Sequence, residues 1–79
     1  MTIEEISEKV NASLAEEFEI EQSLLTADAN IKTTLKLDSL SIIDLVAIVE
    51  DTFSIKTDAQ EIKKIATLGD LYSYIQSKL

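Results

Sequence analysis

The sequence predicts a small all-α protein: a four-helix bundle of three longer helices and one short third helix, with a long loop between the first and second. Two observations predict this class. Apolar residues recur at spacings of three and four, the period of an amphipathic helix, over most of the 79 residues. The chain also has one Gly and no Pro, and a multi-turn β fold needs more of both. This length allows a single domain, residues 1–79.

The first helix should begin immediately, because Thr2-Ile3-Glu4-Glu5 has the form of a capping box. It should end near Phe18, where Glu16, Glu17 and Glu19 oppose the helix dipole. Its apolar residues follow at helical spacing: Ile3, Ile6, Val10, Leu14 and Phe18.

Residues 19–37 form a long connection, and a structureless loop of this length is unusual in so small a domain. We predict a loop that is pinned to the core, with short turns at Ser23–Thr26 or Asn30–Leu35. Its apolar anchors are Ile20, Leu24, Leu25, Ile31, Leu35 and Leu37.

The second half of the chain should contain three helices. The longest covers 39–53. A short third helix, capped by Thr57 or Asp58, covers about Ala59–Lys64 and turns Ile62 and Ile65 inward. Thr67-Leu68-Gly69-Asp70 opens the last helix, whose apolar residues are Leu68, Leu71, Tyr72, Ile75 and Leu79.

Composition limits both stability and chemistry. With no Cys and no His, the chain has neither disulfides nor the usual ligands of a zinc site. Helix packing must therefore stabilise it, at about 25 cal/mol per Å² of buried apolar surface. Ser–His and Cys–His nucleophile pairs are excluded as well. Carboxylate-only catalysis stays open, but a chain of 79 residues has little room for a substrate pocket. We therefore expect no catalytic residue and no metal site, and a reactive nucleophile would have to be supplied by a modification.

The charge of −8, from 15 acids and 7 lysines, repels nucleic acid and anionic membranes and attracts basic protein surfaces. Acidic solubility without any partner is the alternative explanation. No apolar run resembles a signal peptide or a membrane span. We expect a cytoplasmic protein that does not insert into membranes.

The helix over 39–53 has two apolar faces. One is a core face of Ile42, Leu45, Val46, Val49 and Phe53. On the other side, Leu40, Ile43 and Ala47 are interleaved with Asp44, Glu50 and Asp51. An apolar strip with carboxylates around it suits docking of a basic partner. Alternatively, Leu40 and Ile43 pack under a loop.

The start of this helix is where the sequence suggests chemistry. Asp38 can cap the helix, because its carboxylate can accept hydrogen bonds from amides of the first turn. Ser39 then occupies the first helical position, where the macrodipole favours an attached phosphoryl group.

In this setting, Asp38-Ser39-Leu40 resembles the acyl carrier protein family, and the resemblance covers essentially the whole chain without gaps. The triplet alone has little specificity; the helix order, length and charge around it make the signal strong. The other matching features are the opening Ile-Glu-Glu helix, the anchors Ile20, Leu25, Ile31 and Leu35, Asp44-Leu45-Val46, Glu50-Asp51, Phe53, Ile65-Ala66-Thr67-Leu68 and Tyr74-Ile75.

The resemblance implies a bundle of the acyl-carrier type in which Ser39 carries 4′-phosphopantetheine. A separate phosphopantetheinyl transferase attaches this arm from coenzyme A through a phosphodiester, so the chain would be a phosphoprotein. The thiol of the arm would hold acyl intermediates as thioesters for fatty-acid or polyketide-type synthesis, within lipid metabolism. The carrier would be a non-catalytic monomer that serves acyl synthases and transferases with basic surfaces.

The resemblance also assigns a partner surface to the helix over 39–53, in agreement with its outward strip. The apolar contacts would come from Leu40, Ile43 and Ala47, and the contacts to Arg and Lys side chains from Asp44, Glu50 and Asp51.

Four departures from the family pattern leave the pathway open. Lys36 stands where Gly is common, and Ser41 stands where an acid often follows the triplet. The usual Pro is absent from Ser54–Asp58, and Lys63-Lys64 make the third helix unusually basic.

Two other functions stay open at this point. An aminoacyl carrier, of the peptidyl or D-alanyl kind, would use the same arm with different cargo. An unmodified acidic helical adaptor would use the strip alone, and Ser39 would then be only a helix-start residue.

Overall fold

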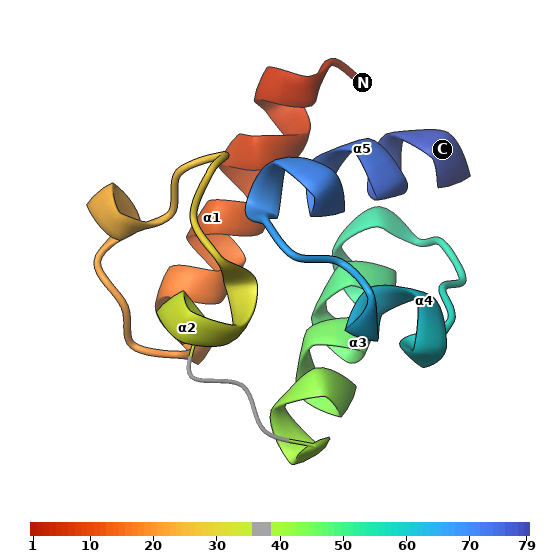
Figure 1. Cartoon of the computed structure of the whole chain (residues 1–79). Helices are drawn as coiled ribbons and strands as arrows, with labels where there is room; N and C mark the ends of the chain where they lie inside the picture. The colour runs from red at the N-terminus through yellow and green to blue at the C-terminus, as the bar shows by residue number, and fades with distance from the viewer. Residues whose placement is uncertain (36–38) are drawn as a thin grey trace.

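Figure 1 shows the computed structural model, which describes the backbone of residues 1–35 and 39–79 and the side chains of residues 1–35 and 42–79. The elements are α1 (Ile3–Glu17), the 3₁₀ turn η1 (Gln22–Leu24), α2 (Ile31–Leu35), α3 (Ser39–Phe53), α4 (Ala59–Lys63) and α5 (Leu68–Lys78). This order confirms the predicted all-α class of three longer helices and a short one. The two short elements within the long connection, η1 and α2, lie at the turns predicted near Ser23–Thr26 and Asn30–Leu35.

The predicted caps explain where the helices begin. Thr2 Oγ1 accepts from Glu5 N while Glu5 Oε1 accepts from Thr2 N, both at 3.2 Å, so the capping box of α1 is complete. Asp58 caps α4 by accepting from the amide of Gln60, and Thr67 caps α5. Each cap satisfies amides that have no partner inside the helix.

Just after α1 and just after α3, one residue adopts the left-handed backbone conformation. Glu19 follows α1 with φ 53°, and Ser54 follows α3 with φ 54°. At the end of α1, the amide of Ile20 donates to the carbonyl of Ala15 at 3.0 Å, which is the longer hydrogen bond of a Schellman motif.

The core lies between α1, which packs against both α3 and α5, and the shorter elements around them. Figure 1 shows α3 and α5 on the same side of α1, with α4 beside α3. No polar or charged side chain is buried among the described residues. The buried apolar side chains are Ile6, Val10, Leu14, Leu25, Ile31, Leu35, Ile42, Leu45, Val49, Phe53, Ile62, Leu68, Leu71, Tyr72 and Ile75.

The connection after α1 is held to the start of α5 by the backbone. An isolated antiparallel bridge pairs Asn30 with Thr67. This junction, together with the apolar anchors, explains why a long connection without much helix stays in place. Its hydrogen bonds run from Ile31 N to Ala66 O (2.9 Å), from Leu68 N to Ala29 O (3.1 Å) and from Gly69 N to Ala27 O (2.7 Å).

A side-chain relay adds a second attachment. The hydroxyl of Tyr72 donates to Asn11 Oδ1 at 2.5 Å, and Asn11 Nδ2 donates to the carbonyl of Leu25 at 3.0 Å. Burial raises the pKa of the Tyr72 phenol above its ordinary value, so the donating form persists throughout the neutral range. The relay therefore links α5, α1 and the connection.

Most predicted anchors are confirmed, but three apolar predictions are wrong. Leu25, Ile31 and Leu35 are buried and Ile20 is half-buried, whereas Leu24 is 57 % exposed. Because η1 is a single turn, the adjacent Leu24 and Leu25 point in different directions, and only Leu25 reaches the core. Leu79 is also exposed, since α5 ends at Lys78. Ile3, the first residue of α1, is 38 % exposed as well. Leu37 lies outside the described residues.

Candidate functional site

The start of α3 is at Ser39, as predicted. The first turn of α3 contains no acidic residue, and the positive end of the helix dipole lies there. A phosphodiester joined to the first residue of α3 fits this end of the helix dipole. The predicted cap by Asp38 and the predicted apolar contact of Leu40 lie outside the described side chains, as does the side chain of Ser39.

The two faces of α3 divide as their periodicity predicts. Ile42, Leu45, Val49 and Phe53 are buried, and Val46 is half-buried against the core. This packing fixes the rotation of α3, and so determines which side chains face outward.

The opposite face of α3 is open. Ile43 is 61 % exposed, so the alternative in which it packs under a loop is wrong. Asp44, Ala47 and Asp51 are exposed as well. We call Ile43, Asp44, Ala47 and Asp51 the outer strip of α3. An exposed branched apolar side chain flanked by carboxylates has the character of a docking surface.

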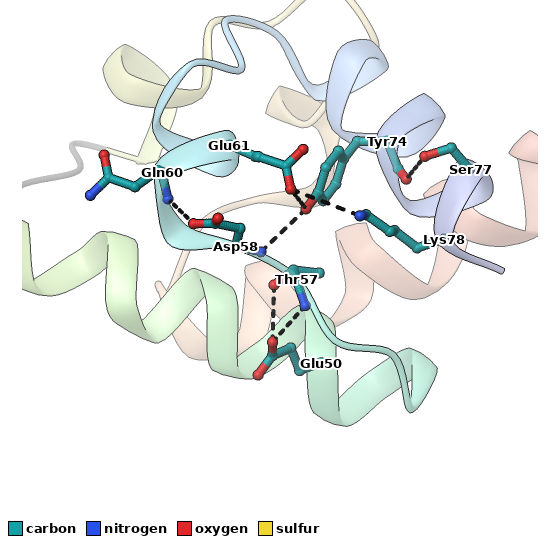
Figure 2. Close-up of polar contacts among 8 residues, drawn as sticks. All are labelled: Glu50, Thr57, Asp58, Gln60, Glu61, Tyr74, Ser77 and Lys78. Carbon is teal, nitrogen blue, oxygen red and sulfur yellow. Dashed lines mark hydrogen bonds and ion pairs between the residues drawn. The ribbon is translucent and has the colours of Figure 1, made fainter.

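Glu50 differs from the other acids that the sequence assigns to partners. It is half-buried, and its Oε2 accepts from the amide of Thr57 at 2.7 Å and from Thr57 Oγ1 at 3.2 Å (Figure 2). Glu50 therefore holds the connection between α3 and α4. The sequence did not reveal this role, because it depends on how that connection folds back along α3.

The same figure shows how α4 is attached to α5. Tyr74 Oη accepts from the amide of Asp58 at 3.3 Å and donates to Glu61 Oε1 at 3.1 Å (Figure 2). Lys78 Nζ lies 3.8 Å from Glu61 Oε1 and 5.4 Å from the centroid of the Tyr74 ring. These partly exposed contacts join the start of α4 to α5.

On its other side, the outer strip borders α1. Two hollows lie between these helices, of about 150 Å³ and about 510 Å³. The sequence reasoning treated Glu16 and Glu17 only as charges that end α1, because one sequence does not show where α1 crosses α3. The smaller hollow is lined by Ser13, Glu16, Glu17, Ile48, Asp51 and Thr52, and the larger by Glu17, Asp44, Ala47, Ile48 and Asp51.

Two further findings concern the described part of the chain alone. None of its helices combines the length and apolar character needed to cross a bilayer. No three of its Asp and Glu side chains converge closely enough to hold a metal ion.

Comparison with known proteins defines the class of this helical domain. Residues 8–75 match the family described as the phosphopantetheine attachment site. The domain is therefore a carrier of covalently attached 4′-phosphopantetheine, in agreement with the predicted cofactor.

The relatives identify the family within this class. The chain is 40 % identical over 76 residues to an acyl carrier protein of Thermotoga maritima, covering 96 % of this chain and 94 % of that protein. It is 37 % identical over 79 residues to an acyl carrier protein of Exiguobacterium sp., with both chains fully covered. A solved structure of the acyl carrier protein from Enterococcus faecalis superposes with a TM-score of 0.80 at 35 % identity, with both chains fully covered. The chain belongs to the acyl carrier protein family, and the resemblance found in the sequence is confirmed.

Proposed function

We propose that this chain carries acyl groups on a 4′-phosphopantetheine arm attached to Ser39. The observation that carries the proposal is the start of α3 at Ser39, in a chain whose residues 8–75 match the phosphopantetheine attachment family. A serine at this position has helix amides on one side and no acid in the turn that follows. Asp38 is proposed to cap the same turn.

The arm and the protein chain have different roles. When bound, the arm supplies the terminal thiol on which acyl groups are carried, a group that a chain without Cys lacks. Ser39 Oγ holds the phosphodiester, and the amino end of α3 stabilises its negative charge. No side chain of the protein is proposed to catalyse a reaction; the carrier family is generally non-catalytic.

We propose that the outer strip of α3, with Leu40 and Glu50, binds partner enzymes. The partners are a phosphopantetheinyl transferase and the acyl synthases and transferases of fatty-acid or polyketide-type synthesis. Ile43 supplies an exposed apolar contact, while Asp44 and Asp51 suit Arg and Lys side chains. We also propose that the carrier acts as a monomer in the cytoplasm.

The proposal is tested by loading the purified protein with coenzyme A and a broad-specificity phosphopantetheinyl transferase. Intact mass spectrometry should show the addition of one arm to the wild type and none to Ser39→Ala. Ser41→Ala is the matched control, because it removes a hydroxyl two residues away in the same turn and should still be loaded. Failure of the wild type to gain an arm would overturn the proposal.

The mass of the protein isolated from its source tests the cargo. An acyl addition beyond the arm supports the carrier proposed here. An aminoacyl addition would assign the chain to the peptidyl or D-alanyl carriers, and a protein found only without the arm would support the unmodified adaptor.

A further inference from the structure

The two hollows between α1 and α3 form one groove, because they share Glu17, Ile48 and Asp51. The groove begins at the outer strip of α3 and continues to the carboxyl end of α1, which packs against α3. Any helix that docks along the outer strip would therefore have this groove at its flank.

The groove is acidic, and the described residues provide it with no cation. Glu16, Glu17, Asp44 and Asp51 are all exposed, and the ion pair found among the described residues, between Lys78 and Glu61, lies elsewhere. The last turn of α1 contains no basic residue, so its carboxyl-terminal carbonyls add to the negative potential.

The shape of the groove selects among cations. Ala47 and Ile48 give it an apolar wall, and the smaller hollow has a volume of about 150 Å³. Arg and Lys combine a charged head with an apolar stem, which suits a wall of this kind beneath carboxylates. A bare metal ion fits poorly, because no three described carboxylates converge.

We propose that the groove receives an Arg or Lys side chain of the partner enzyme, so that the carboxyl end of α1 forms part of the partner surface. The occupant is a basic side chain on the enzyme surface that covers the outer strip. This inference rests on the proposed carrier function and extends its docking surface from one helix to two. Charge complementarity of this kind acts mainly on encounter and register.

Glu17→Lys is the test variant and Glu8→Lys is its matched control. Both replace an exposed acid of α1 by the same cation, but nine residues are two and a half turns, so Glu8 is on the opposite side of the helix. A cation at the end of α1 is also favourable for its dipole, so Glu17→Lys should not unfold the protein. Thermal unfolding verifies this for each variant.

The readout is the KM for the carrier in two reactions. One is loading of the arm by a broad-specificity phosphopantetheinyl transferase, and the other is transfer of an acyl group from an acyl-coenzyme A donor to the arm thiol by an acyl transferase, which releases coenzyme A. For at least one enzyme, Glu17→Lys should raise KM about fivefold at low salt, with kcat unchanged, and Glu8→Lys should stay within about twofold of the wild type. The difference should shrink at about 0.5 M salt, because screening shortens the range of charge interactions.

Equal KM values for Glu17→Lys and Glu8→Lys with both enzymes would overturn the two-helix surface while leaving the carrier function intact. A wild-type protein that accepts no arm would overturn the carrier function itself, and this inference with it. The two failures are therefore distinguishable.

Discussion

Gly69 is the residue through which the loop before α3 is fixed to the bundle, and replacing it by Ala tests that attachment. Its amide donates to the carbonyl of Ala27 at 2.7 Å. A Cβ at this position would lie 2.9 Å from the same carbonyl oxygen and 3.5 Å from the Ala27 Cβ. Gly69 does not have a positive φ, so close approach of two backbones, and not an unusual conformation, requires the glycine.

The expected change in the free energy of unfolding is the difference between a favourable and an unfavourable effect of the added methyl group. Ala is favoured over Gly in a helix by about 1 kcal/mol. Against this, the loop must retreat from α5, which weakens the hydrogen bond to Ala27 and strains the neighbouring bonds at Ile31 and Leu68. A lost hydrogen bond that leaves a backbone group unpaired costs about 1–3 kcal/mol, and forced contacts in packed regions cost about 1–3 kcal/mol more. We expect Gly69→Ala to reduce the free energy of unfolding by about 2 kcal/mol.

Urea unfolding measures this change, and thermal unfolding should show a Tm lower by about 8–16 °C for a chain of this size. Ser73→Ala is the control, because Ser73 is exposed on the same helix and its replacement should be nearly neutral. Amide exchange of Ile31 and Leu68 should accelerate in Gly69→Ala alone. A Gly69→Ala protein as stable as the wild type would show that the loop is not held at Ala27, and would refute this account of its attachment.

Two smaller changes test the ends of α1. Glu19→Gly should stabilise the protein by about 0.5–1 kcal/mol in urea unfolding, because Glu19 has a positive φ that glycine adopts without strain. Glu21→Gly is the control: Glu21 has φ −66°, so this replacement should destabilise the protein in the same assay. At the other end, hydrogen bonds from the backbone and side chain of Thr2 hold the pKa of Glu5 below its ordinary value. Its stabilising contribution is therefore present above the ordinary pKa of Glu and is lost as pH falls through the lowered value. Thr2→Ala should raise the pKa of Glu5 in an NMR titration, and an unchanged value would contradict the capping box.

The sequence predicted the features that depend on interactions within one helix. The predicted bounds of α3, Ser39–Phe53, are confirmed, and Thr2, Asp58 and Thr67 cap their helices as predicted. The exposed Ile43 and the buried Leu45 follow from the same period.

Features that depend on tertiary contacts were not predicted. The bond from Thr57 to Glu50 requires the chain after α3 to fold back, and Leu24 faces solvent because a single 3₁₀ turn presents only Leu25 inward. Likewise, Glu17 and Asp51 line the same hollow only because α1 packs against α3, which no spacing within one helix reveals.

The central claim, that Ser39 holds the arm, is tested most directly by locating the modification on protein purified from its source. Cleavage after lysine releases residues 37–56, a peptide that contains Ser39, Ser41 and Ser54. Fragmentation of this peptide should place 4′-phosphopantetheine on Ser39. An arm on either of the other two serines, or a peptide that carries no arm, would contradict the account.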